Sequence, residues 1–185
     1  MRIGRLKESL YRLLYAPEKF ARKLGARIGA NCRIYTYYWG SEPWLIEIGD
    51  HVHITRDVKF VTHDGGVWVF RDREPAVDVF GLIKIGDNTF IGNEALILPG
   101  VTIGRNCVVG AMSVVSRSVP DNTVVAGNPA KVICTTDEYY QRIKDYFVTT
   151  KSLKPRERER LLRHLPVEKL LVKKLIDCER NIQRK

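Results

Sequence analysis

The chain has 185 residues, of which 44% are hydrophobic and 28% charged, and its formal net charge is +10. This composition is typical of a globular protein with one main domain, and no apolar run approaches the ~20 residues of a membrane-spanning helix. The charge does not indicate a nucleic-acid partner, because residues 28–150, with eleven Lys/Arg and fourteen Asp/Glu, are slightly acidic. The basic excess lies in residues 1–27 and 151–185.

Residues 1–27 are predicted to form an N-terminal helical flank. Apolar residues recur at helical spacing over residues 5–24, and Pro17 interrupts the pattern. We expect a short helix that packs on the first coil of the next domain, with contact of this basic segment with a membrane surface as the alternative.

The chain is expected to be cytoplasmic, with a peripheral position at the inner membrane as the alternative. Its first residues do not resemble a secretory signal. Its four cysteines are widely spaced and show no zinc-binding pattern, which fits a reducing compartment; they are Cys32, Cys107, Cys134 and Cys178.

A six-residue repeat occupies residues 28–133. It is clearest from Ile85 to Val115, where every sixth residue is Ile or Val and the next is usually Gly. Weaker units begin at Ile28 and Ile48, and the repeat resumes at Val119 after a slip of four. The fifth residue of the clear units is small or modest in size: Thr89, Ala95, Val101, Cys107 and Ser113. A period of six does not fit the apolar stripe of a helix.

Each unit is predicted to be one short strand and a turn, and three units close a triangular coil of 18 residues. The first and fifth residues face inward, so that Ile85 stacks on Ile103, and Cys32 and Cys107 are buried structural thiols. Gly at the second position is expected to permit unusual backbone angles without a Cβ penalty. The prediction is an all-β core formed by a parallel β-helix.

Two excursions interrupt the repeat. The first, from Tyr35 to Leu45, is rich in aromatic residues, which either close the first coil by packing or form a wall that stacks on a sugar; they are Tyr35, Tyr37, Tyr38, Trp39 and Trp44. The second is a protruding loop, residues 64–82, which starts directly after His63. Loops of this length tend to be functional or disordered, and the aromatic residues of this loop argue against disorder. Such a loop can wrap a neighbouring subunit.

Residues 134–185 are predicted to form a C-terminal helical tail. Leucines at helical spacing favour helices over residues 136–147 and 155–182. The N-terminal flank and this tail therefore lie on either side of the central domain, residues 28–133, in the sequence.

Residues 91–133 resemble the hexapeptide-repeat acyltransferases. The segment IGNEALILPGVTIGRNCVVGAMSVVSRSVPDNTVVAGNPAKVI is similar to the C-terminal signature of that family. The region around THDGG, which contains His63, looks like the branch that acetylates sugars, including galactoside, maltose and polysaccharide acetyltransferases. The resemblance implies a left-handed parallel β-helix, an exception to the usual right-handed crossover. It also implies a homotrimer with acetyl-CoA as cosubstrate in a groove between adjacent subunits.

The resemblance also implies roles for individual residues. His63 matches the catalytic histidine of the family, and Asn93 matches the position whose backbone amide lies near the thioester carbonyl. Gly110 and Ala111 match the backbone that binds the pantetheine amides.

Further along the implied cofactor groove, Ser116 and Arg117 match a Thr/Ser-Lys pair. Lys131 matches a basic residue near the phosphate end of CoA. Met112 departs from the family, in which Gly is usual, and is expected to leave the fold intact while narrowing the groove.

The chemistry proposed for His63 is general-base catalysis. An imidazole suits proton transfer near neutral pH, and direct attack needs no acyl-enzyme if both substrates are held in line. A backbone N–H such as that of Asn93 would stabilise the oxyanion. Asp64 is not assumed to pair with His63, because neighbours on an extended chain point in opposite directions.

A zinc site is not expected, although a zinc-dependent carbonic-anhydrase family shares this repeat. Such a site needs three converging histidines. His51 and His63 are 12 residues apart, which places them on different faces of an 18-residue coil, and His53 lies in the same unit as His51.

The leading hypothesis is therefore O-acetylation of a sugar or polysaccharide precursor. The alternatives are N-acetylation of an amino sugar, transfer from another acyl-CoA, and a non-catalytic β-helix scaffold. Fold analogy alone does not establish activity.

Overall fold

The structure is a computed structural model that describes residues 11–173. The parts of the predicted helices that fall at residues 5–10 and 174–182, and Cys178, lie outside the described residues. The chain divides into two compact units, with the boundary between Asp137 and Glu138.

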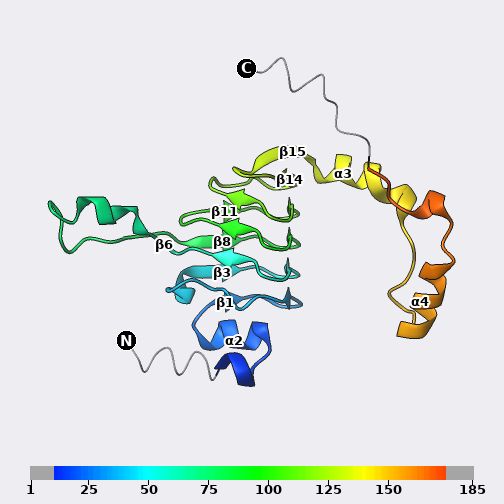
Figure 1. Ribbon diagram of the computed structural model, residues 1–185, viewed down its shortest axis with the longest axis horizontal. Coiled ribbons are helices and arrows are strands. Elements are labelled where there is room, and N and C mark those ends of the chain that lie inside the picture. The colour runs from blue at the N-terminus through cyan, green and yellow to red at the C-terminus, as the bar shows by residue number, and fades with distance from the viewer. Residues whose placement is uncertain (1–10, 174–185) are drawn as a thin grey trace, which may run out of the picture. The chain divides into compact units, whose positions relative to one another are not determined.

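The first unit is a column of coils in which short strands follow one another around three parallel sheets (Figure 1). Sheet A contains β1 (Arg27–Ile28), β3 (Ile46–Ile48), β8 (Ile83–Ile85) and β11 (Thr102–Ile103). Sheet B contains β2 (Arg33–Ile34), β4 (His53–Ile54), β9 (Phe90–Ile91), β12 (Val108–Val109), β14 (Thr123–Ala126) and β15 (Lys131–Thr135). Sheet C contains β5 (Lys59–Phe60), β10 (Leu96–Ile97) and β13 (Val114–Val115). All pairs within the sheets are parallel except β14 with β15, which is antiparallel.

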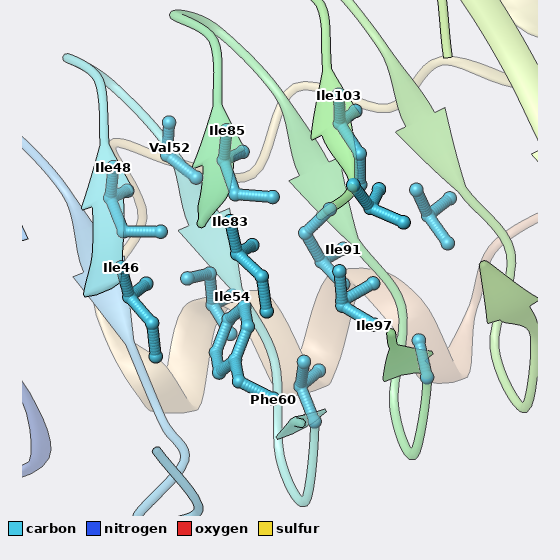
Figure 2. Packing of buried hydrophobic residues seen from close by; sticks show 14 of the residues in the cluster. Ile46, Ile48, Val52, Ile54, Phe60, Ile83, Ile85, Ile91, Ile97 and Ile103 are labelled. Carbon is cyan, nitrogen blue, oxygen red and sulfur yellow. The ribbon is translucent and has the colours of Figure 1, made fainter. Parts of the chain in front are cut away.

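The core is built by the first and fifth residues of the repeat, as predicted. Ile85 pairs in register with Ile103, one coil later, and Figure 2 shows Ile48, Ile85 and Ile103 following one another through the interior. The fifth residues of the clear units, including Thr89 and Cys107, are likewise buried. Cys32, which was also predicted to be buried, is only partly buried, because it belongs to the first coil of the column. Burial raises the pKa of the Cys107 thiol, which keeps it protonated at neutral pH.

The second-position glycines have a different role from the one predicted. The left-handed backbone falls on the fourth residue of each unit, for example Asn88, Glu94 and Asn106, whose φ angles are between 53° and 59°. The glycines are needed because successive coils approach closely: a Cβ added to Gly92 would lie 2.5 Å from the backbone nitrogen of Ala111. The prediction that these glycines supply unusual backbone angles is therefore wrong.

A ladder of polar side chains runs along the turns between sheets A and B. His51 Nδ1 lies 2.8 Å from Asn88 Oδ1, Asn88 Nδ2 donates to Asn106 Oδ1 at 2.8 Å, and Asn106 Nδ2 donates to Asn122 Oδ1 at 3.0 Å. All four residues have a positive φ. Asn tolerates this conformation better than most residues, so the ladder accounts for the recurring Asn at the fourth position.

The N-terminal end of the column is covered by α2 (Pro17–Lys23), in which Phe20 and Ala21 are fully buried. Pro17 begins this helix, and the Phe20 ring packs edge to face on Tyr37. The aromatic excursion contains the short 3-10 helix η1 (Pro43–Leu45). It divides into a packed part, with Trp39 buried and stacked on Phe60 at 5.0 Å, and an exposed part that includes Tyr35 and Trp44.

The loop of residues 64–82 leaves the column as a hairpin (Figure 1). Its base is formed by β6 (His63–Asp64) and β7 (Val79–Phe80), which pair antiparallel, and the 3-10 helix η2 (Gly65–Phe70) follows β6. An ion pair of 2.6 Å joins Arg71 to Asp78 within the hairpin. Trp68 near the tip is 76% exposed.

The second unit contains short helices. They are α3 (Thr136–Ile143), which begins in the first unit, η3 (Lys144–Tyr146), α4 (Pro155–Arg163) and η4 (Val167–Lys169). The prediction of one continuous helix over residues 155–182 is wrong, because α4 ends at Arg163 and Pro166, which lacks a backbone N–H, follows. Among residues 164–173, the one helical segment is the 3-10 helix η4. Among the described residues, no helix is long and apolar enough to cross a membrane.

Candidate active site

His63 lies where the chain leaves sheet C and enters the protruding hairpin. The preceding residues continue the sheet, since the Val61 backbone N–H donates to the Ile97 carbonyl at 2.9 Å. In the hairpin, His63 pairs with Phe80, whose ring stands edge-on to the imidazole with centroids 6.3 Å apart. The His63 side chain is 44% exposed, so it is held on two sides and accessible to solvent.

A carboxylate binds one edge of this imidazole. Glu42 Oε2 lies 3.1 Å from His63 Nδ1, and the Glu42 side chain is only 17% exposed. The same oxygen accepts a 2.5 Å hydrogen bond from the Thr62 hydroxyl. Asp64 does not take part: its carboxylate accepts from the Gly66 backbone N–H. Because a carboxylate only accepts, the contact places the proton of a neutral His63 on Nδ1.

Four of the residues matched to the cofactor groove lie together at the turns from sheet B to sheet C, here called the B–C corner. Asn93 follows β9, and its carbonyl accepts from the Met112 backbone N–H at 2.8 Å. Gly110 and Ala111 follow β12 one coil further on. Lys131, on β15, pairs with Ala126, whose Cβ would be 2.8 Å from a Cβ on Gly110. These residues form a row parallel to the axis of the column.

Ser116 and Arg117 lie elsewhere. They follow β13 and are exposed at the turns from sheet C to sheet A, here called the C–A corner. His63 follows β5 at the same corner, two coils away. Within one chain, His63 and Asn93 are therefore at opposite ends of sheet C and are not brought together.

The structure distinguishes between the two residues matched to the pantetheine. The Gly110 N–H donates to the Val125 carbonyl at 2.8 Å, and the Gly110 carbonyl accepts from Ser113 Oγ at 2.7 Å. Both polar groups of Gly110 thus serve the β-helix, whereas Ala111 is exposed. Met112 is also exposed and has a φ of 58°, a conformation that favours Gly. This accounts for the family's usual residue at that position.

The described histidines do not converge on a metal site. His51 belongs to the polar ladder at the A–B turns, and His53 lies on sheet B between the rings of Tyr35 and Phe90. Within residues 11–173, no group of three His, Cys, Asp or Glu side chains is placed to hold a metal ion.

Glu42 is the site residue that the sequence did not reveal. It precedes His63 by 21 residues and belongs to an excursion whose path no repeat specifies. An available signal was the interruption of the repeat: both excursions leave the column near the same coil, Glu42 lies in the first, and His63 directly precedes the second.

Comparisons with known proteins agree with this architecture. Residues 83–117 match the family model of the bacterial transferase hexapeptide (six repeats). Protein CapG of Staphylococcus aureus is 52% identical over 141 residues, which are 75% of this chain and 82% of that protein. The solved hexapeptide-repeat acetyltransferase VCA0836 of Vibrio cholerae superposes with a TM-score of 0.57 at 28% identity, over 72% of this chain and 88% of that one. The chain belongs to the hexapeptide-repeat acetyltransferases.

Membership of the hexapeptide-repeat acetyltransferases implies the left-handed sense of the β-helix. A second solved structure, of VCA0836 in complex with acetyl coenzyme A, superposes with a TM-score of 0.51 at 26% identity, over 64% of this chain and 75% of that one. The aligned proteins therefore include one that binds a CoA thioester on the same scaffold.

Proposed function

We propose that this hexapeptide-repeat acetyltransferase moves an acetyl group from acetyl-CoA to a hydroxyl of a sugar or polysaccharide precursor. The acetyl-CoA complex of VCA0836 supports the cosubstrate. The observation that carries the proposal is the half-exposed imidazole of His63, bound through Nδ1 to Glu42 so that Nε2 lies on the far side of the ring. The sugar acceptor is supported by the resemblance of the THDGG segment to the sugar-acetylating branch.

His63 is proposed to act as the general base. Nε2 takes the proton of the acceptor hydroxyl while the hydroxyl oxygen adds to the thioester carbonyl carbon. A backbone N–H at Asn93 stabilises the oxyanion. Collapse of the intermediate breaks the C–S bond, and His63 returns the proton to the CoA sulfur.

The site is proposed to be completed between two copies of the chain in a homotrimer. His63 and Arg117 lie at the C–A corner, whereas Asn93, Ala111 and Lys131 lie at the B–C corner. Since one chain keeps these corners at opposite ends of sheet C, a groove between neighbouring columns would place His63 of one copy against the row of the next. The pantetheine would contact the backbone at Ala111, with Lys131 and Arg117 available to CoA phosphates.

The acceptor class is tested by measuring free-thiol release from acetyl-CoA with a panel of sugars, amino sugars and nucleotide-linked sugars. We expect turnover with a hydroxyl acceptor, and mass spectrometry of the product to show an ester. A product that carries an amide instead would favour N-acetylation. Absence of acetyl-CoA binding would favour the scaffold hypothesis.

The location of the site between copies predicts complementation between two inactive variants. His63→Ala removes the base, and Ala111→Trp obstructs the B–C corner. After the two proteins are unfolded together and refolded as mixed trimers, some grooves combine an intact His63 with an intact Ala111, so we expect activity to return. Measured thiol release that stays at the level of the separate variants would contradict a site shared between copies.

A further inference from the structure

Glu42 belongs to the first excursion and His63 directly precedes the second, and several hydrogen bonds organise the contact between them. We infer that Glu42 is a positioning residue that fixes the tautomer of His63 and stabilises its protonated form during acetyl transfer. This inference rests on the proposed function, because it assigns Glu42 a role that acts through the base.

Thr62 holds Glu42 at two points. Its hydroxyl donates to Glu42 Oε2 at 2.5 Å, and its oxygen accepts from the Glu42 backbone N–H at 3.3 Å. Thr62 is fully buried. The backbone and the carboxylate of Glu42 are thus both hydrogen-bonded to the residue that precedes His63. These two bonds fix the position of the carboxylate relative to the imidazole.

The backbone on both sides of Glu42 brings its carboxylate close to Thr62 and His63. A Cβ added to Gly40 would lie 2.7 Å from Thr62 Oγ1, so the backbone there passes closer than a side chain would allow. Trp39 is buried against Phe60, and Pro43 is buried directly after Glu42. Proline restricts the backbone of the residue before it. The excursion therefore delivers a preorganised carboxylate, which neither interpretation of its aromatic residues anticipated.

The chemistry follows from the acceptor-only character of a carboxylate. With Glu42 bound at Nδ1, the neutral imidazole presents the lone pair of Nε2 on its other side. When Nε2 takes the acceptor proton, the imidazolium forms 3.1 Å from a carboxylate that is largely shielded from solvent. Such a pair is screened less than a surface pair. The apolar ring of Phe80 stands edge-on to the imidazole, and the carboxylate of the adjacent Asp64 is engaged with Gly66.

The test is Glu42→Gln, which preserves the size of the side chain and removes its charge. General-base catalysis contributes about 10²–10⁴-fold, so we expect kcat to fall by about tenfold to a hundredfold, with KM for acetyl-CoA unchanged. When the His63 imidazole is neutral, its ¹⁵N NMR spectrum should show the Nδ1–H tautomer in the wild type and a mixture of the Nδ1–H and Nε2–H tautomers in Glu42→Gln. Thr62→Val, which removes the hydroxyl that orients the carboxylate, should shift the spectrum in the same direction.

Glu47→Gln is the matched control. Glu47 is a carboxylate on sheet A that pairs with Arg27 and Lys84, away from His63, and its loss should leave kcat and the tautomer unchanged. A wild-type spectrum dominated by the Nε2–H tautomer would overturn the inference without the need for any variant. If Glu42→Gln keeps full kcat while His63→Ala is inactive, the positioning role of Glu42 is refuted, and the role of His63 as general base is retained. If His63→Ala is fully active, the role of His63 as base fails as well, whereas acetyl transfer itself is refuted only if the wild type releases no thiol with any acceptor.

Discussion

Replacing His63 by alanine is expected to lower kcat by about 10²–10⁴-fold, the usual contribution of a general base. The imidazole lies half-exposed at the mouth of the hairpin, with Nδ1 held by Glu42, and alanine leaves no group to receive the acceptor proton. Because His63 contributes nothing to the buried core, the Tm should change little. Thiol release at saturating acetyl-CoA, together with a thermal melt, measures both effects.

His51→Asn is the matched control for that experiment. Asn already occupies the next three positions of the polar ladder and adopts the same positive φ, so this variant should keep both fold and activity. Activity retained by His63→Ala, or lost equally in His51→Asn, would refute the assignment of His63 as base.

Replacing Ile91 by alanine is expected to lower the free energy of unfolding by about 2–5 kcal/mol, as for other large-to-small changes in a packed core. Ile91 is fully buried and stacks between Ile54 and Val109 in sheet B. Its removal would leave a cavity in the middle of the column, which neighbouring coils on both sides prevent from collapsing. Urea unfolding at fixed protein concentration measures the change.

Ile133→Ala provides the comparison, because Ile133 is 53% exposed on β15. A change at such a position is expected to stay within about 0.5 kcal/mol. Equal losses from the two variants would show that the stacked interior does not dominate stability.

The strands and the core could be predicted because the repeat encodes both. A residue such as Ile85 recurs after one coil as Ile103, so periodicity alone gives register and burial. The same logic correctly predicted that Thr89 and Cys107 face inward. Periodicity did not predict the role of the glycines, because the sequence does not show how closely successive coils approach. A Gly that is required for close approach recurs at the same spacing as a Gly that is required for its backbone angle.

The site was predictable only in part for a related reason. His63 was marked by its place at the start of a long interruption and by the family resemblance, whereas Asn93 and Ala111 were marked by the resemblance alone, and the roles of all three stay predictions. The contact between Glu42 and Thr62 depends on the path of a non-repeating segment, in which a single Gly40 and a buried Trp39 decide where the carboxylate arrives. Pairing of this kind is specified by packing in three dimensions.

The two ends of the column have a consequence for solubility. A stack of parallel strands presents unpaired backbone groups at both ends, and identical copies could join there into a filament. At one end α2 buries Phe20 and Ala21 against the first coil. At the other end, β15 runs antiparallel to β14 (Figure 1). A further coil would add a parallel strand, so the last strand of sheet B does not continue the pattern of the column. We therefore expect α2 and the antiparallel β15 to disfavour the addition of further coils at the first coil and along sheet B.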